Sequence, residues 1–211
     1  VVTLEDDSVV TATLDGLIDE EPARSHVEVN GERFRVSPRS FWQSHEMAPE
    51  ILTREVLELA KVRRGSRVVD LFSGVGLFSV PLARRVGSDG RVIAVESSSS
   101  AAADARRNVA DLPYVTVVEQ RVTPRLVRET IDDVTTVVLD PPRSGAGIPV
   151  MEALAKARPD RIVYVSCDAA TLARDCRVLV DAGWSLSHIR AFDLFPMTAH
   201  VELVAALDRP R

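Results

Sequence analysis

From Ala48 onward, short continuous apolar runs alternate with stretches whose apolar residues recur at helical spacing. The first helix is expected to begin near Ala48, with Pro49 as a first-turn residue. The strands expected after it are 67–72, 91–96, 114–119, 135–140, 161–166, 184–192 and 200–208. The helices expected between them are 77–86, 99–110, 123–130, 148–157 and 169–182. This alternation predicts an α/β fold with a mostly parallel, seven-stranded sheet covered by helices on both faces.

Two features refine this prediction. No helix is expected between the last two strands, so one antiparallel strand should enter the sheet. The run Ser97 to Ser100 is expected to begin a helix, with a serine hydroxyl capping its free N–H groups.

Residues 1–46 have a different pattern. Residues 9–14 alternate as in a strand, and 27–36 form two strand-like runs around Asn30-Gly31, a hairpin signal. We expect 1–46 to be a small β element, a remnant of a central or linker domain. It would lean on the main domain, residues 47–211, or belong to a missing one, because its strands are too few to bury a core.

Composition narrows the class of protein. The 211 residues are 45% hydrophobic and contain no apolar run near the roughly 20 residues that a membrane helix requires. The chain begins with Val and lacks a basic leader followed by an apolar segment, so we expect no targeting peptide and an excised fragment. The net charge of −5 argues weakly against a domain that grips nucleic acid by electrostatics alone.

The chain has two cysteines, Cys167 and Cys176. They cannot form a disulfide framework or a four-thiolate metal site, so a reducing cytoplasm is expected. Cys176 fits a small buried hydrophobic residue. Cys167 closes an apolar run directly before a predicted helix, where the helix dipole is expected to lower the thiol pKa.

A strand, a glycine turn and a helix start occur together at residues 69–78. Gly74 and Gly76 allow the backbone to approach a ligand, but the third glycine of the dinucleotide fingerprint is missing. Asp70 suits a cationic or hydroxylated ligand, and Glu96 ends the next strand, where an acid can take both ribose hydroxyls of an adenosine. S-adenosylmethionine therefore fits better than a dinucleotide, although a surface carboxylate is the plain alternative for Glu96.

Reactive side chains follow the later strands. Asp140 stands at the carboxyl end of strand 135–140, where open α/β sheets bind ligands. Arg143 occupies the place after Asp-Pro-Pro where an aromatic residue would suggest an amino substrate, so amino-group methylation is disfavoured. Arg143 could meet a phosphate or a developing enolate, or it could simply be solvated. Cys167 and Glu202 together supply a thiol that can add to a ring carbon and a carboxylate that can later remove a proton.

The chain resembles the RNA (uracil-5-)-methyltransferase family over roughly residues 38–208. The resemblance lies in segments 41–45 (Phe-Trp-Gln-Ser-His), 70–76, 140–145, 165–168 (Val-Ser-Cys-Asp), 171–175 (Thr-Leu-Ala-Arg-Asp) and 193–202, which ends in His-Val-Glu. It implies a Rossmann-like class I methyltransferase fold, Cys167 as nucleophile and Glu202 as general base. It further implies cofactor contacts from Gln43, Phe72, Glu96 and Asp140. His45, Leu77 and Asp168 depart from the family, which often has Asn at each place.

We therefore expect an enzyme that methylates carbon 5 of an rRNA or tRNA uridine through a covalent cysteine–carbon 6 adduct. The expected catalytic residues are Cys167, Glu202 and Asp140, and Arg143 is expected to bind substrate. The residues expected to bind S-adenosylmethionine are Gln43, Asp70, Phe72, Gly74, Glu96 and Asp140. We expect a monomer in the cytoplasm, without a membrane or a metal ion in this chain. The alternatives are a methyltransferase acting on cytosine or an amino nitrogen, and a non-catalytic RNA-binding module.

Overall fold

A seven-stranded sheet forms the centre of the protein. The computed structural model describes residues 2–3, 9–10, 25–195, 198 and 201–210. The strands of this sheet are β5 (Arg67–Leu71), β6 (Arg91–Glu96), β7 (Val115–Glu119), β8 (Thr136–Leu139), β9 (Arg161–Ser166), β10 (Ser185–Phe192) and β11 (Glu202–Asp208). Their order is β10-β11-β9-β8-β5-β6-β7. The predicted seven-stranded, mostly parallel sheet is confirmed.

The antiparallel strand is β11. It runs antiparallel to β9 on one side and to β10 on the other, whereas β9, β8, β5, β6 and β7 pair in parallel. The described residues between β10 and β11 include no helix, and β11 enters beside β9 from the opposite end. Consequently β11 begins at the sheet edge where the parallel strands end.

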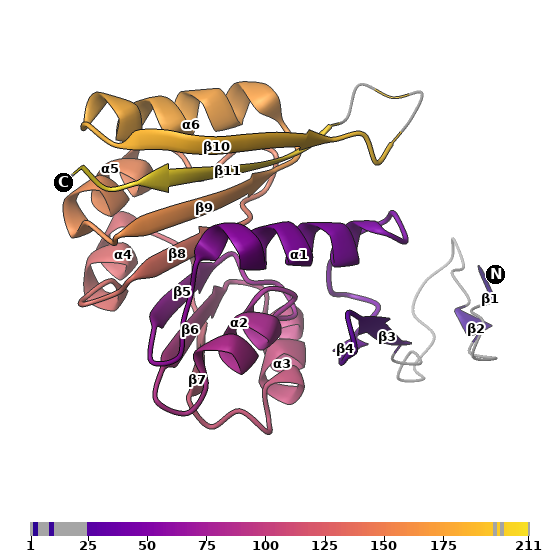
Figure 1. The fold of residues 1–211 in the computed structure, drawn as a ribbon. Helices are drawn as coiled ribbons and strands as arrows, with labels where there is room; N and C mark the ends of the chain where they lie inside the picture. The colour runs from indigo at the N-terminus through magenta and orange to yellow at the C-terminus, as the bar shows by residue number, and fades with distance from the viewer. Residues whose placement is uncertain (1, 4–8, 11–24, 196–197, 199–200, 211) are drawn as a thin grey trace.

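Helices cover both faces of the sheet (Figure 1). The helices α1 (Ala48–Ala60), α2 (Ser79–Val86) and α3 (Ser99–Asn108) pack on one face. The helices α4 (Pro124–Thr130), α5 (Ile148–Ala157) and α6 (Ala169–Asp181) pack on the other. Strands β8 and β9 are buried along their whole length, which explains why their sequences are nearly continuous apolar runs.

The predicted boundaries agree with the structure to within about two residues. Helix α2 begins two residues later than expected, because 72–78 form the turn that follows β5. Ser98 is the N-cap of α3 and its Oγ accepts from Ala101 N at 3.4 Å, so the predicted serine cap is confirmed.

The Asn30-Gly31 turn joins strands β3 (Ser25–Val29) and β4 (Glu32–Val36), as predicted. Asn30 and Gly31 have φ values of 50° and 82°, the left-handed conformation that a two-residue hairpin turn requires. The hairpin packs on α3, and Phe34 and Val36 belong to the same core as α1 and α2.

Two side chains of α3 anchor this hairpin through partly buried hydrogen bonds. Asn108 on α3 accepts from Arg35 N at 2.8 Å and donates to Arg35 O at 3.0 Å. Asp104, also on α3, accepts from Ser37 N at 2.7 Å. Further upstream, the two-residue strands β1 (Val2–Thr3) and β2 (Val9–Val10) pair with each other, and the alternation predicted over 11–14 lies outside the described residues.

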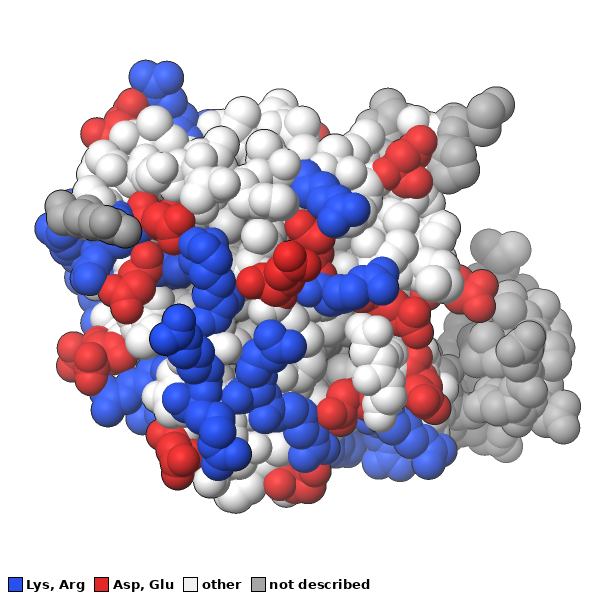
Figure 2. All heavy atoms as spheres, in the orientation of Figure 1, with Lys and Arg blue, Asp and Glu red and all other residues white. Residues whose placement is uncertain are grey.

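Charge is distributed unevenly over the surface, and Figure 2 shows basic side chains gathered toward the lower left. Five exposed cations stand around the starts of β5 and β6: Lys61, Arg63, Arg64, Arg67 and Arg91. They surround the amino ends of the parallel strands. Over the residues that the structure describes, none of the helices is long and apolar enough to cross a membrane.

Candidate active site

Five neighbouring strands deliver one candidate side chain each to the same edge of the sheet. Strand β6 ends at Glu96, and Phe72, Asp140 and Cys167 directly follow β5, β8 and β9. Glu202 is the first residue of β11. Because β11 is antiparallel, its start coincides with the ends of the others. Residues spread over more than 100 positions of sequence therefore form one row.

The glycine turn bends the chain sharply after β5. Phe72, Gly74 and Gly76 all have positive φ values, of 61°, 56° and 92°. A Cβ at Gly74 would meet no atom of the described residues within 4 Å, so among them the backbone there borders space that a ligand can approach. Phe72 adopts the left-handed conformation without being glycine, which costs on the order of 1 kcal/mol and is typical of functional sites.

Glu96 fastens this turn to the next loop. Its Oε2 accepts from Gly74 N at 2.9 Å, and its Oε1 accepts from Ser98 N at 2.6 Å. The carboxylate is thus oriented by two backbone N–H groups at the sheet edge. This placement suits the predicted ribose contact better than the alternative of a plain solvated carboxylate.

Asp70 lies one residue below the edge and is fully buried. Ser79 at the start of α2 donates to its Oδ2 at 2.5 Å, while Oδ1 is buried and has no hydrogen-bond partner within the described part of the chain. Burial chiefly raises the pKa of Asp70 to about 7; hydrogen bonds from Ser79 oppose this and the charge of Glu96 adds to it. A buried carboxylate with an unused oxygen is suited to a cationic ligand group.

Asp140 continues the parallel ladder past β8, and its N donates to Leu71 O at 3.3 Å. Burial raises its pKa well above the ordinary value, and the charges of Glu202 and Asp70 add to the effect. Asp140 thus lies between the glycine turn and the thiol, close enough for the charges of Asp70 and Glu202 to raise its pKa.

Glu202 and Cys167 are neighbours across the β9–β11 pair. The register pairs Leu203 with Ser166, so the residues one step beyond are Glu202 and Cys167. Glu202 is 7% exposed; burial raises its pKa, and the charge of Arg143 partly offsets this. The structure therefore brings together the thiol and the carboxylate that were predicted to act on one ring.

The expected pKa shift of Cys167 was wrong in direction. Burial raises the thiol pKa, the charges of Glu202 and Asp140 raise it further, and Arg143 opposes them. Cys167 lies directly before Asp168, the N-cap of α6, whose carboxylate accepts from Thr171 N at 2.8 Å. Burial and the two nearby carboxylates therefore outweigh the favourable effect expected from the helix dipole.

The other predicted residues lie on the loops around this edge. Arg143 is exposed on the loop after Asp140, and its charge acts on Cys167, Glu202 and Asp168. Gln43 is half-buried in the segment before α1. In the same segment the ring of His45 meets that of Phe195 edge-on, with 5.9 Å between centroids. Segments 41–45 and 193–195 therefore lie side by side.

Cys176 is free and 7% exposed on α6, in agreement with the small buried hydrophobic residue expected from sequence. Burial, with a contribution from Asp175, raises its pKa to about 12, so it is unreactive at neutral pH. Cys167 is half-buried and also free.

Sequence reasoning missed the partners of these residues. Nothing near Ser79 signals its bond to Asp70, nine positions earlier. Asp175 lies in segment 171–175, from which no role was predicted for it, yet its side chain is fully buried and accepts a hydrogen bond from Tyr164 Oη. A signal was present: Asp175 interrupts the apolar stripe of Leu172, Cys176 and Leu179 on α6.

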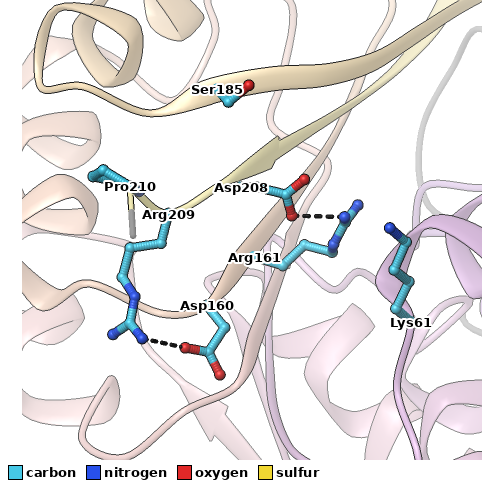
Figure 3. Close-up of a pocket in the computed structure, with 7 residues that line it drawn as sticks. All are labelled: Lys61, Asp160, Arg161, Ser185, Asp208, Arg209 and Pro210. Carbon is cyan, nitrogen blue, oxygen red and sulfur yellow. Dashed lines mark ion pairs between the residues drawn. The ribbon is translucent and has the colours of Figure 1, made fainter.

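A separate hollow of about 580 Å³ lies at the opposite edge of the sheet (Figure 3). Its charged side chains are largely paired, Arg161 with Asp208 at 2.6 Å and Arg209 with Asp160 at 2.7 Å. It adjoins the start of β9 and the end of β11. It therefore does not include the row formed by Glu96, Asp140, Cys167 and Glu202.

The sheet order, the glycine turn after β5 and the site at the carboxyl edge define a class I methyltransferase fold. The chain matches the tRNA (uracil-5-)-methyltransferase family over residues 16–209. It belongs to that family.

Individual relatives agree with this assignment. An uncharacterised RNA methyltransferase of Streptomyces avermitilis is 42% identical over 196 residues, covering 92% of this chain and 45% of the relative. The 23S rRNA (uracil(1939)-C(5))-methyltransferase RlmD of Psychrobacter arcticus is 38% identical over 182 residues. That match covers 83% of this chain and 35% of the relative. This chain thus spans less than half the length of these relatives.

Among solved structures, the tRNA (uracil-54, C5)-methyltransferase of Pyrococcus abyssi, in complex with S-adenosyl-L-homocysteine, superposes with a TM-score of 0.74. It is 33% identical, and the match covers 89% of this chain and 44% of that protein.

Proposed function

We propose that this chain is the catalytic part of an S-adenosylmethionine-dependent enzyme that methylates carbon 5 of a uridine in rRNA or tRNA. The observation that carries the proposal is the adjacency of Cys167 and Glu202 across β9 and β11, beside the half-buried carboxylates of Asp140 and Glu96. Support also comes from family membership and from relatives named for uracil-5 methylation of 23S rRNA and of tRNA.

The residues present fit the cofactor. Asp70 Oδ1 is buried and has no hydrogen-bond partner among the residues that the structure describes, which suits an ammonium group. Gly74 borders open space, and Glu96 is already held by Gly74 N and Ser98 N in a position to accept from ribose hydroxyls. Gln43, Phe72 and Asp140 would complete the binding set. When bound, S-adenosylmethionine supplies the electrophilic methyl group that carbon 5 of the uracil accepts.

The chain's own residues supply the remaining chemistry. The Cys167 thiolate forms a bond to carbon 6 of the ring, and the carbon 5–carbon 6 double-bond electrons move to give an enolate that is nucleophilic at carbon 5. Once methylated, carbon 5 still bears its hydrogen. Glu202 removes that proton, the double bond re-forms, and the bond from carbon 6 to Cys167 breaks, which releases the thiolate. The positive charge of Arg143 stabilises the Cys167 thiolate and the enolate.

Two features favour this reaction over methylation of an amino nitrogen. That reaction needs neither a nucleophilic thiol nor a base beside it, and the residue after Asp140-Pro-Pro is Arg143 rather than an aromatic side chain that could stack on an amino-bearing base. The target uridine must leave its stack to reach the sheet edge, which is the general requirement for enzymes acting on a base within folded RNA.

The test is covalent trapping with 5-fluorouridine-substituted rRNA and tRNA in the presence of S-adenosylmethionine. Fluorine cannot be removed from carbon 5 as a proton is, so we expect an adduct that survives denaturation and is absent in Cys167→Ser. With ordinary RNA, Glu202→Gln is expected to accumulate methylated RNA still attached to protein. Cys176→Ser, which alters the other thiol, is the matched control and should trap normally. Failure of the unmodified protein to trap either RNA would overturn the proposal and favour a cofactor-fold module that only binds RNA.

A further inference from the structure

Asp175 on α6 is a buried carboxylate outside the row of site residues. Its side chain is 0% exposed. Its Oδ2 accepts from Tyr164 Oη at 2.7 Å, Ala146 N at 2.7 Å and Gly147 N at 3.2 Å. Its Oδ1 accepts from Arg174 Nε at 2.9 Å and Nη2 at 2.7 Å. Five donors therefore converge on one buried carboxylate, which makes a fully satisfied polar network.

These bonds link α6 to the loop that follows β8. Arg174 Nη2 also donates to Ser144 O at 2.8 Å, and Gly145 N closes a turn onto Pro142 O at 2.8 Å. Residues 144, 146 and 147 are thus all tied to one pair of α6 side chains. The neighbour of this anchored segment is Arg143, whose charge acts on the Cys167 thiol.

The same carboxylate reaches the strand that ends at the thiol. Tyr164 lies three residues before Cys167 on β9 and pairs with Leu139, the residue before Asp140. Burial and then the hydrogen bond to Asp175 raise the pKa of Tyr164, so its hydroxyl stays protonated and donates. Asp175 therefore connects the segment carrying the nucleophile with the segment carrying Asp140 and Arg143.

Gly145 shows how closely the loop approaches. It has a φ of +78°, and a Cβ there would lie 2.6 Å from Asp175 Oδ2 and 2.5 Å from Arg174 Nη2. The hydrogen bonds of Asp175 and Arg174 to this loop therefore depend on glycine at position 145, because a side chain there would displace those groups or the loop.

We propose that Asp175 is a positioning residue, which holds loop 140–147 so that the Arg143 guanidinium stays beside the Cys167 thiol. This role rests on the proposed function. Its first test, however, is independent of RNA and of methyl transfer, so the two can fail separately.

The test measures the pH dependence of Cys167 alkylation by iodoacetamide, with peptide mass spectrometry to separate Cys167 from Cys176. Asp175→Asn removes a negative charge, which by direct electrostatics would lower a thiol pKa and speed alkylation. Positioning predicts the opposite: Arg143 moves away, and the profile shifts to higher pH by about half a unit, equivalent to about threefold in rate at a fixed pH below the pKa. In an Arg143→Gln background, Asp175→Asn should cause no further shift.

Asp181→Asn is the matched control. Asp181 lies on the same helix and accepts from Arg177 Nε at 2.7 Å, but it is exposed. It should leave the profile unchanged. Tyr164→Phe, which removes a single donor from Asp175, should shift the profile in the same direction by less, and it keeps the test decisive if Asp175→Asn does not fold. In methyl transfer to rRNA or tRNA, Asp175→Asn should lower kcat by about 10- to 100-fold with a smaller change in KM for S-adenosylmethionine. An unchanged alkylation profile in both variants, or a shift to lower pH, would overturn the inference.

Discussion

Glu202 stands directly across from Cys167, one step beyond the Ser166–Leu203 pair of the β9–β11 ladder. Its charge raises the pKa of the thiol, after burial and ahead of Asp140. The carboxylate suited to removing a proton at the end of the reaction therefore makes the thiol less acidic at the start. Of the groups that act on Cys167, the positive charge of Arg143 opposes this effect and favours the ionised thiol.

Glu202→Gln should make Cys167 more reactive in the free protein. Loss of the neighbouring negative charge lowers the thiol pKa, so alkylation near pH 7.5 should become several-fold faster while turnover on RNA falls. The measurement is the iodoacetamide rate at Cys167 against pH. Slower alkylation would show that the two groups do not interact as the register implies.

Arg143→Gln should have the reverse effect. Arg143 lowers the pKa of Cys167, so its removal should move the alkylation profile to higher pH and slow the reaction at neutral pH. Arg177→Gln is the control, because Arg177 is an exposed arginine paired with Asp181. A profile that responds equally to both changes would remove Arg143 from the site.

Stability should fall as pH rises across the acid range in which Asp70 ionises. A carboxyl whose pKa is raised on folding contributes its full stability at a pH below its pKa in the unfolded state, which is near 3.8. That stability is lost as the pH rises through the pKa in the folded state, which is about 7 for Asp70. The Asp140 and Glu202 pKa values are raised as well and act in the same direction. We expect the urea midpoint to decrease from pH 5 to pH 8, and Asp70→Asn to flatten that dependence. An equally steep dependence in Asp70→Asn would contradict the assignment.

Binding of S-adenosylmethionine should depend on Glu96. Loss of two hydrogen bonds from ribose hydroxyls to a charged acceptor would weaken the affinity by about 10- to 100-fold in Glu96→Gln, measured by calorimetry. Glu119 ends the adjacent strand β7, and its carboxylate instead pairs with Arg106. Glu119→Gln should bind normally. Equal affinity in both variants would place the ribose elsewhere.

Asp104 should be important for stability rather than for chemistry. It accepts from Ser37 N at 2.7 Å, Ser37 Oγ at 2.8 Å and Ser40 Oγ at 2.7 Å. Burial pushes the Asp104 pKa up, but these bonds and the charge of Arg107 outweigh it and leave the pKa below its ordinary value. Asp104→Ala leaves the donors partly buried and unpaired, at a cost of about 3 kcal/mol in unfolding free energy. Denaturant titration should show this loss, and Asp111→Ala on the exposed surface should not.

The fold could be read from the sequence because its signals are local. Apolar runs at 67–72, 91–96, 135–140 and 161–166 predict buried strands, and helical spacing predicts the segments between them. Asn30-Gly31 and Ser98 mark a hairpin and a helix start through backbone conformation and capping, which involve only near neighbours. The row of edge residues followed as well, since parallel strands end together.

The electrostatics could not be read in the same way, because they depend on groups distant in sequence. Local reasoning placed Cys167 at a helix start and predicted a lowered pKa, whereas burial, Glu202 and Asp140 reverse the sign. Asp175 interrupts an apolar stripe in the sequence, but only the packing of α6 against loop 140–147 gives it five donors. Sequence alone determined the order of elements and the reactive residue types. The tertiary structure decided which charges share a low-dielectric space, because that depends on distances the chain sets only once it has folded.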